Sequence, residues 1–553
     1  MRPFKNEPFT DFSQAANRRA MEQAIRKVER QLGREYPIAV GGREIRLPEK
    51  FESVSPLDPS RVVGIFQQAD AAQARQAVEV AAGAFRDWRF LAPEKRARCL
   101  FKIANILRRR KFELAAWMVF EVGKSWPEAD GDVAQAIDFC NFYGREAIRY
   151  GAPQPIGQAP GEKDEFIYIP LGVGAVIPPW NFPLAILTGM TAASLAAGNT
   201  VVLKPSSDSP AIGYYLFEIA REAGLPAGVL NFVTGSGAVA GEALVEHPRT
   251  RFVAFTGSKD VGIRISEAAG RLAPGQVWIK RVILEMGGKD AIVVASDADL
   301  DDAVAGVVVS AFGYQGQKCS ACSRAIVVAD VYDEFLARLL ARVEAIKVGP
   351  PTVQENFMGP VVNEAALNRI LRYIEIGKGE GRLLTGGNQL PRKGFYIEPT
   401  VIADVAPNAV IAQEEIFGPV LAVIKARDYY HALEIANSTV YGLTGSVYTR
   451  DREKINLAKE IFHVGNLCIN RRCTGILVDA NPLGGFNLSG TDSKSGGRDY
   501  LLHFLQAKSI AEKLQAGNYP AGKRRASKSP TRKARTSRIR RPRPRRKRAV
   551  ARR

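Results

Sequence analysis

Residues 174–205, GAVIPPWNFPLAILTGMTAASLAAGNTVVLKP, contain the stretch of sequence that decides the fold. The short apolar runs at its two ends are typical of buried strands, and the apolar segment 183–198 between them is typical of a helix. A strand, a helix and a second strand in this order predict two parallel strands, because the helix returns the chain to the starting edge of the sheet. The stretch therefore indicates an α/β fold in which helices cover a parallel sheet.

The same alternation continues along the chain. Strand-like runs follow at 228–235 and 251–258, with the helix-like segment 208–224 before them. A second alternation begins at Arg281 and continues to about Gly445. We expect two α/β domains, a Rossmann-type nucleotide-binding domain followed by a domain that carries the chemistry. Residues 12–33 and 71–150 show helical periodicity ahead of them.

Length and composition exclude several classes of protein. A chain of 553 residues with 46% hydrophobic and 24% charged residues suits two or three packed domains. No apolar run reaches the ~20 residues that span a bilayer, and the first residues, MRPFKNEPFTDF, lack the apolar region of a secretory signal. Six cysteines in so long a chain indicate free thiols in a reducing compartment, so we expect a cytoplasmic protein.

The basic charge is concentrated at the C-terminus. Residues 523–553 contain 17 Lys and Arg and no Asp or Glu, which leaves about +3 of the net +20 for the rest of the chain. Dense like charge with few apolar residues predicts a disordered tail. Such a tail could bind phosphates without sequence preference, so nucleic-acid binding, or contact with an acidic partner, is an alternative function of a different class. The tail has no aromatic residue for base stacking.

Cys319, in FGYQGQKCSACSR, is the candidate nucleophile. It follows a helix-like run and precedes a strand-like run, and Gly313 and Gly316 allow a tight turn that could present a thiolate to a cleft. The plain alternative is a small buried side chain. Cys322 completes a CxxC, but the chain has no second CxxC and its four histidines are scattered, so we expect neither a redox pair nor a metal site.

Two polar residues follow strand-like runs and could assist a nucleophile. Glu285, in VILEMGGKD, could act as the base for a hydrolytic water. The amide of Asn181, in IPPWNFPL, could donate to a developing oxyanion. Alone, each has a structural alternative, a paired carboxylate for Glu285 and a helix cap for Asn181.

The candidate cofactor site combines a turn and a lysine. Gly257 and Ser258 in AFTGSKDVG lie between a strand and a helix, whose first N–H groups could hold a pyrophosphate. Lys204 in LKPSSDSP ends a strand and could reach ribose hydroxyls, or it could be an ordinary surface lysine. The usual GxGxxG fingerprint does not follow a strand in this chain.

The chain contains six characteristic strings in this order: PWNFPL, LKPSSDSP, FTGSKDVG, LEMGGKD, FGYQGQKCSACSR and EEIFGPVL. Together they resemble the aldehyde dehydrogenase superfamily, and the resemblance covers residues 1 to 515. The resemblance implies an NAD-dependent enzyme in which Cys319 is the nucleophile, Glu285 the general base and Asn181 the oxyanion donor. It also implies a small β flap through which family members assemble as dimers or larger, near 161–170 and 488–510. The residues that it assigns to the cofactor are Trp180, Lys204, Ser207, Gly257, Ser258, Glu415 and Phe417.

Further strings, among them EVGKSWPEADGDVAQAIDFCNFY, RLAPGQVWIKR and FHVGNLCINR, resemble the 1-pyrroline-5-carboxylate dehydrogenase group. That group oxidises L-glutamate γ-semialdehyde to glutamate in proline breakdown. The resemblance assigns Ser320 and the amides of Gly475 and Ile476 to the substrate's charged end, and Phe182 to its aliphatic chain. The same-class alternative is a dehydrogenase for another semialdehyde or an aliphatic aldehyde.

Two positions depart from the pattern. Leu483 stands where the group usually has a Phe, which could broaden the range of chain lengths that the enzyme accepts. Ser207 stands where many NAD-preferring relatives have a Glu, so NADP remains open as the cofactor.

We expect five segments along the chain. They are an N-terminal helical arm (1–50), an NAD-binding domain that includes flap strands near 152–170 (51–282), a catalytic domain (283–483), an oligomerisation segment (484–515) and the basic tail (516–553).

Overall fold

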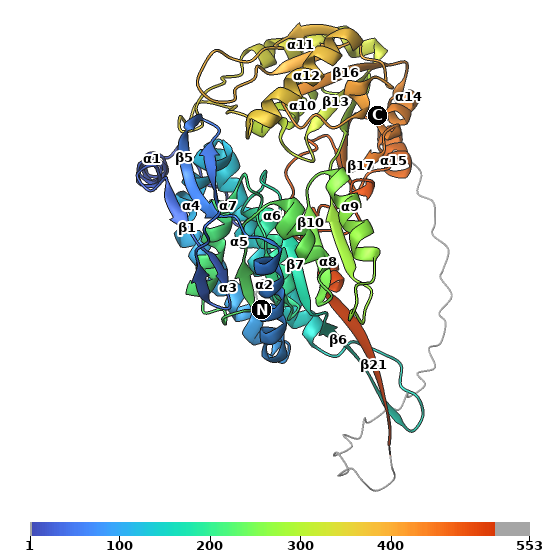
Figure 1. Cartoon of the computed structure of the whole chain (residues 1–553). Coiled ribbons are helices and arrows are strands. Elements are labelled where there is room, and N and C mark those ends of the chain that lie inside the picture. The colour runs from blue at the N-terminus through green and yellow to red at the C-terminus, as the bar shows by residue number, and fades with distance from the viewer. Residues whose placement is uncertain (1–2, 515–553) are drawn as a thin grey trace, which may run out of the picture.

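The structure, a computed structural model, describes residues 3–514. These residues form two seven-stranded sheets and three smaller ones. Figure 1 shows two lobes, with β7 and β10 in one and β13 and β16 in the other. The expected disorder of the basic tail, 516–553, concerns residues outside the described range.

The first sheet has the order β11-β10-β7-β8-β9-β2-β3, and its strands from β11 to β9 are parallel. The strand predictions at 174–179, 199–205, 228–235 and 251–258 are confirmed. Their bounds are β7 (Val173–Ile177), β8 (Thr200–Leu203), β9 (Leu230–Phe232) and β10 (Thr250–Thr256), and β11 (Arg281–Glu285) completes the parallel part of the sheet.

The far edge of this sheet is antiparallel, unlike the all-parallel sheet that the alternation predicts. β2 (Ile38–Val40) and β3 (Arg43–Ile45) form a hairpin, and β2 pairs antiparallel with β9. Only Gly41 and Gly42 separate the two strands, both with positive φ (62° and 80°). A two-residue turn of this kind joins antiparallel strands and favours glycine at both positions.

Helices cover the first sheet, and their ends follow local sequence signals. Asp70 accepts from the N–H groups of Ala72 and Gln73, and the Gln73 side chain accepts from the Asp70 N–H, so a capping box begins α2. The long helical run after residue 93 divides at Arg110 into two helices. The bounds are α1 (Ala15–Glu29), α2 (Ala71–Trp88), α3 (Pro93–Arg109), α4 (Lys111–Val122), α5 (Trp126–Gly151), α6 (Ala185–Ala196), α7 (Pro210–Glu222), α8 (Glu242–Glu246) and α9 (Lys259–Gly270).

The second sheet has the order β14-β15-β16-β13-β12-β18-β19, and only the β14–β15 pair in it is antiparallel among the described residues. Its strands are β12 (Asp290–Val294), β13 (Cys322–Val328), β14 (Arg382–Thr385), β15 (Thr400–Ala403), β16 (Val420–Ala426), β18 (Thr444–Tyr448) and β19 (Asn466–Ile469). Its helices are α10 (Leu300–Phe312), α11 (Tyr332–Glu344), α12 (Glu364–Glu380), α13 (Val410–Gln413), α14 (Tyr429–Asn437) and α15 (Arg452–Ile461).

A two-stranded arm projects away from both lobes (Figure 1). It pairs β6 (Glu162–Pro170) antiparallel with β21 (Leu505–Lys513). The second strand begins later than position 488, where we expected it, because the preceding segment packs on the first sheet. There the Thr491 N–H donates to the Leu284 carbonyl at 3.0 Å. The remaining strands are β1 (Arg34–Tyr36), β4 (Lys50–Ser55) and β5 (Asp58–Gln67) in one small sheet, and β17 (Tyr441–Gly442) with β20 (Phe486–Asn487) in another.

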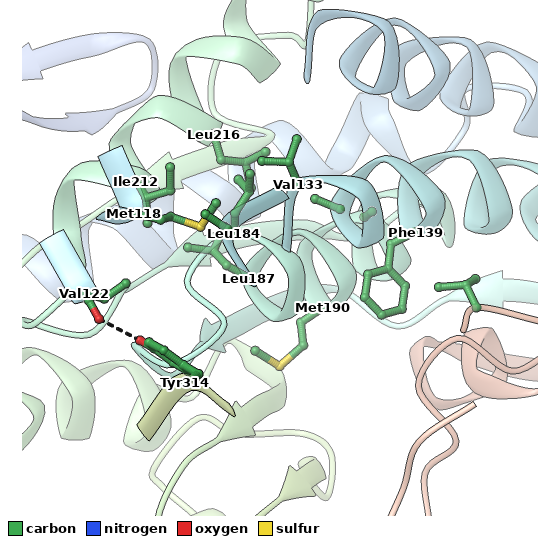
Figure 2. Close-up of a cluster of buried hydrophobic side chains, with 14 of the residues drawn as sticks. Met118, Val122, Val133, Phe139, Leu184, Leu187, Met190, Ile212, Leu216 and Tyr314 are labelled. Atoms are coloured by element: carbon green, nitrogen blue, oxygen red, sulfur yellow. Dashed lines mark hydrogen bonds between the residues drawn. The ribbon is translucent and has the colours of Figure 1, made fainter. Parts of the chain in front are cut away.

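The core between the helices reaches the candidate nucleophile turn. Figure 2 shows buried side chains of α4, α5, α6 and α7 packed together, and the Tyr314 hydroxyl donating to the Val122 carbonyl at the end of α4. Tyr314 and Gln315 have positive φ (53° and 59°), and the Gln315 amide donates to the carbonyls of Gly123 and Pro360. The core thus holds the turn before Cys319 in a conformation that L residues rarely adopt.

Within residues 3–514, no helix has the length and apolar character that would let it cross a membrane.

Candidate active site

The carboxyl ends of four neighbouring strands in the first sheet bring several predicted residues to one edge. Glu285 ends β11, Gly257 and Ser258 follow β10, residues 180–182 follow β7, and Lys204 follows β8. The register pairs Thr256 with Glu285 and Phe255 with Ile177, so these strand ends are level. Open α/β sheets bind their ligands at this edge.

In the second sheet, the predicted residues lie at the amino ends of the strands instead. Cys319 precedes β13, Glu415 and Phe417 precede β16, and the pair Gly287–Gly288 precedes β12. The chain passes from β11 of the first sheet to β12 of the second through residues 286–289 alone. The two sheets therefore meet where Glu285, Cys319 and Glu415 lie.

Gly287 and Gly288 make this meeting close. A Cβ atom on Gly288 would overlap the Cys319 carbonyl oxygen, and one on Gly287 would overlap the Glu415 carboxylate. The Gly288 N–H also donates to Glu415 Oε1 at 3.0 Å. Only glycine allows the backbone to pass between these two groups.

The surroundings of Cys319 disfavour its thiolate form. Burial raises its pKa well above the ordinary value, and the carboxylates of Asp290, Glu415 and Glu285 raise it further. Cys322, three residues on, is buried as the first residue of β13, and its Sγ lies 3.5 Å from the Arg324 carbonyl oxygen. Of the two, Cys319 is the more exposed.

Asn181 is buried beside the nucleophile turn. Its Nδ2 donates to the Gln317 carbonyl oxygen at 3.1 Å, two residues before Cys319. The Gln317 side chain in turn accepts from the Val362 N–H. An amide has two N–H donors, so this bond fixes Asn181 and leaves a second donor that a substrate oxygen could accept.

Glu285 is held by the segment after residue 484. Its carboxylate accepts from the Ser493 hydroxyl at 2.6 Å and from the Gly485 N–H at 3.2 Å. Burial nevertheless raises its pKa to about 8, although both hydrogen bonds act in the opposite direction. A carboxyl group with a pKa near the working pH suits proton transfer.

The predicted cofactor residues line the same edge. Burial lowers the pKa of Lys204 to about 8, and its Nζ donates to the Pro205 carbonyl. The Ser258 hydroxyl caps α9 by accepting from the Val261 N–H.

The Trp180 and Phe417 rings, one from beside each sheet, pack edge to face with centroids 5.5 Å apart. Burial raises the pKa of Glu415 to about 7. Ser207, in contrast, is exposed to solvent.

The predicted substrate residues lie on the other side of Cys319. The Ser320 carbonyl oxygen accepts from the Cys473 thiol at 3.3 Å, which links the nucleophile to the loop that contains Gly475 and Ile476. The ring of Phe182 lies over the Lys124 ammonium, 4.1 Å from centroid to Nζ. The Leu483 backbone pairs with Ser495, near the residues that hold Glu285.

Two buried ion pairs beside Cys319 escaped the sequence analysis. Lys318 pairs with Glu128 at 2.6 Å, and the fully buried Lys124 pairs with Asp132 at 3.0 Å. Both carboxylates come from the first turns of α5, four residues apart and thus on one helix face. That spacing is visible in the sequence, but nothing in it shows that the lysines lie opposite.

Comparison with known proteins agrees with this geometry. Residues 45–510 match the aldehyde dehydrogenase family model. The chain belongs to the aldehyde dehydrogenase family. It is 56% identical over 512 residues to 1-pyrroline-5-carboxylate dehydrogenase from Geobacillus thermodenitrificans, covering 93% of this chain and 99% of that protein.

Two solved structures of family members are also similar. The 1-pyrroline-5-carboxylate dehydrogenase from Thermus with bound NAD matches at a TM-score of 0.92 and 52% identity, covering 93% of this chain and 99% of that one. Proline utilization A from Bdellovibrio bacteriovorus matches at a TM-score of 0.92 and 45% identity, over 94% of this chain and 54% of that one. The aldehyde dehydrogenase fold predicted from the sequence is therefore confirmed.

The close approach of Gly288 to the Cys319 carbonyl oxygen predicts that a larger residue at this position impairs catalysis. Gly288→Ala should lower the kcat of aldehyde oxidation about 100-fold, because displacing Cys319 by a fraction of an ångström misaligns the reacting atoms. Gly83→Ala, a helical glycine whose added Cβ would meet nothing within 4 Å, is the matched control and should leave kcat unchanged. Retention of more than half of the activity by folded Gly288→Ala protein would contradict this picture of the contact.

Proposed function

We propose that this aldehyde dehydrogenase oxidises L-glutamate γ-semialdehyde to L-glutamate with NAD, through a thioester on Cys319. The observation that carries the proposal is the convergence of Cys319, Glu285 and Asn181 at the meeting of the two sheets, in a chain 56% identical over nearly its whole length to a 1-pyrroline-5-carboxylate dehydrogenase. The reaction would be the second oxidative step of proline degradation.

The residues at the edge of the first sheet fit a dinucleotide. Lys204 offers ammonium donors to ribose hydroxyls, the turn at Gly257 and Ser258 offers the N–H groups of α9 to a pyrophosphate, and Glu415 can accept from the second ribose. Bound there, NAD supplies the hydride acceptor. NAD is our first choice because the Thermus relative binds it. NADP stays open, because the exposed Ser207 places no carboxylate against a 2′-phosphate.

Acylation begins at the Cys319 sulfur. The thiol gives its proton to water as Sγ bonds to the aldehyde carbon, and the carbonyl oxygen becomes an oxyanion. We assign the stabilisation of that charge to Asn181 Nδ2 and the Cys319 N–H, since donors aimed at an oxyanion typically contribute about 10²–10³ in kcat. As the C=O bond re-forms, the C–H hydrogen leaves as hydride and the carbon remains as a thioester.

Deacylation is the role we assign to Glu285. Its ionised carboxylate takes a proton from water as the water oxygen bonds to the thioester carbon, and the Cys319 sulfur leaves and recovers its proton. The bonds from Ser493 and Gly485 hold Glu285 aside while the hydride is transferred. It must turn toward Cys319 for the second half of the reaction.

We assign substrate selection to the loop 473–478, with Ser320 and Phe182. The N–H groups of Gly475 and Ile476 would receive the α-carboxylate, and Phe182 would pack on the methylene chain. Leu483 completes this wall in place of an aromatic residue, which favours some tolerance of chain length.

The segments expected from the sequence become our proposal for the domains. Residues 51–282 would bind the nucleotide, 283–483 would carry the nucleophile, and the β6–β21 arm would join a second copy of the chain in a dimer or larger assembly. An isolated two-stranded ribbon is marginally stable, which supports a partner for the arm. We place the enzyme in the cytoplasm, where its six thiols stay reduced.

A substrate panel tests the proposed specificity. With NAD, glutamate γ-semialdehyde should give a kcat/KM at least tenfold above that of pentanal, an uncharged aldehyde of similar length, because only the former offers charge to the loop. NADH absorbance measures both. Equal values would leave an aldehyde dehydrogenase of another specificity.

The pKa of Glu285 predicts a pH profile for deacylation. Because the base must be ionised and its pKa is raised to about 8, the rate of thioester hydrolysis should fall about tenfold per pH unit below 8 and level off above it. Ser493→Ala removes a hydrogen bond that favours the carboxylate, so its inflection should lie at higher pH. The steady phase after an NADH burst, followed from pH 6 to 10, measures this rate. An inflection that Ser493→Ala leaves in place would remove Glu285 from the role.

A further inference from the structure

The N-terminal segment, residues 3–13, lies along α5 and is tied to it by charged and polar groups. The Glu7 N–H donates to Asp138 Oδ1 at 2.7 Å, and the Thr10 N–H donates to Asp130 Oδ2 at 2.7 Å. The Glu7 carboxylate accepts two bonds from the Arg108 guanidinium at 2.8 and 2.7 Å. These contacts hold the segment against α3 and α5, and α5 also carries Glu128, the partner of Lys318 next to Cys319.

Asn6 reaches beyond α5 to the proposed substrate loop. Its Nδ2 donates to Asp138 Oδ2 at 2.9 Å and to the carbonyl oxygen of Val478 at 3.1 Å. Val478, buried at 1% exposure, ends the loop 473–478. One amide group thus joins the first residues of the chain, the long helix α5 and a loop 472 positions away.

The loop is held at its other end by the nucleophile turn. The Cys473 thiol donates to the Ser320 carbonyl, next to Cys319. Between these two ends lie Gly475, with φ of 85°, and Ile476. A loop attached at one end to the nucleophile and at the other to the N-terminal segment has its middle N–H groups placed by both attachments.

We propose that Asn6 is a positioning residue for substrate specificity: through Val478 it holds the loop 473–478 at the distance from Cys319 that lets the loop receive the charged end of the substrate. This inference rests on the proposed function. Asn6 itself contacts neither substrate nor cofactor. Its surroundings suit the role, because Asp138 is 5% exposed and Asn6 half-buried, so water competes little for the bonds.

The first variant is Asn6→Ala, with Asn17→Ala as its matched control. Asn17 is another N-terminal amide, but its Nδ2 donates only to the Asp11 carbonyl within its own segment among the described contacts. Asn6→Ala should raise the KM for glutamate γ-semialdehyde roughly tenfold and leave kcat and the constants for pentanal within twofold. Asn17→Ala should change none of them. An equal loss for both aldehydes would show a merely structural role and overturn the inference.

The second variant separates the two bonds of Asn6. The exchange Asn6→Asp/Asp138→Asn restores a hydrogen bond between positions 6 and 138 and keeps an acceptor for the Glu7 N–H, but offers no donor to the Val478 carbonyl. The thermal stability should recover relative to Asn6→Ala while the KM stays raised. A KM that returns to the wild-type value would overturn the inference.

Hydrogen exchange keeps the test independent of the substrate. The N–H groups of residues 475–478 should exchange faster in Asn6→Ala than in the wild type or Asn17→Ala. Unchanged exchange would overturn the inference even if the kinetics moved. If the wild type shows no preference for glutamate γ-semialdehyde over pentanal, the proposed function fails, and faster exchange would still show the contact of Asn6 with the loop.

Discussion

The four residues that carry the chain from the first sheet to the second are the constraint on which the rest of the structure depends. Between Glu285 and Asp290 the backbone passes so close to the Cys319 carbonyl oxygen that Gly288 leaves no room for a Cβ atom, and a Cβ atom on Gly287 would displace the Glu415 carboxylate. Because the crossing is this short, the carboxyl edge of one parallel sheet is pressed against the amino edge of the other. The residues that follow β7, β8, β10 and β11 and those that precede β12, β13 and β16 converge there as a consequence of the topology.

Burial then sets the electrostatics of the site. Three carboxyl groups, Glu285, Asp290 and Glu415, surround a thiol and all have raised pKa values because they are buried. Burial, and to a smaller extent these carboxyl groups, raises the pKa of the Cys319 thiol well above its ordinary value, so forming a thiolate there is costly. The same burial raises the pKa of Glu285 to about 8, although its carboxyl group accepts hydrogen bonds from the Gly485 N–H and the Ser493 hydroxyl.

The sequence predicted the first sheet well because buried parallel strands and their crossover helices carry strong local signals, as in residues 174–205. Cys319, Glu285 and Asn181 were candidates because each follows or precedes such an element, and the family resemblance supplied the roles that we propose for them. The antiparallel pairing of β2 with β9, the pairing of Lys318 with Glu128, and the contact of Asn6 with Val478 were not predictable in this way. Those features depend on which distant segments meet, and no local periodicity encodes a partner hundreds of residues away.

The most direct test of the account is a peptide map of Glu285→Gln protein that has been mixed with NAD and glutamate γ-semialdehyde and then quenched in acid. With the base removed, the covalent intermediate should accumulate, so the map should show one glutamyl group in thioester linkage on the peptide that contains Cys319, removable by hydroxylamine. An acyl group on any other residue would contradict the account. So would an unmodified Cys319 peptide from protein that has produced its burst of NADH but has not gone on to steady turnover.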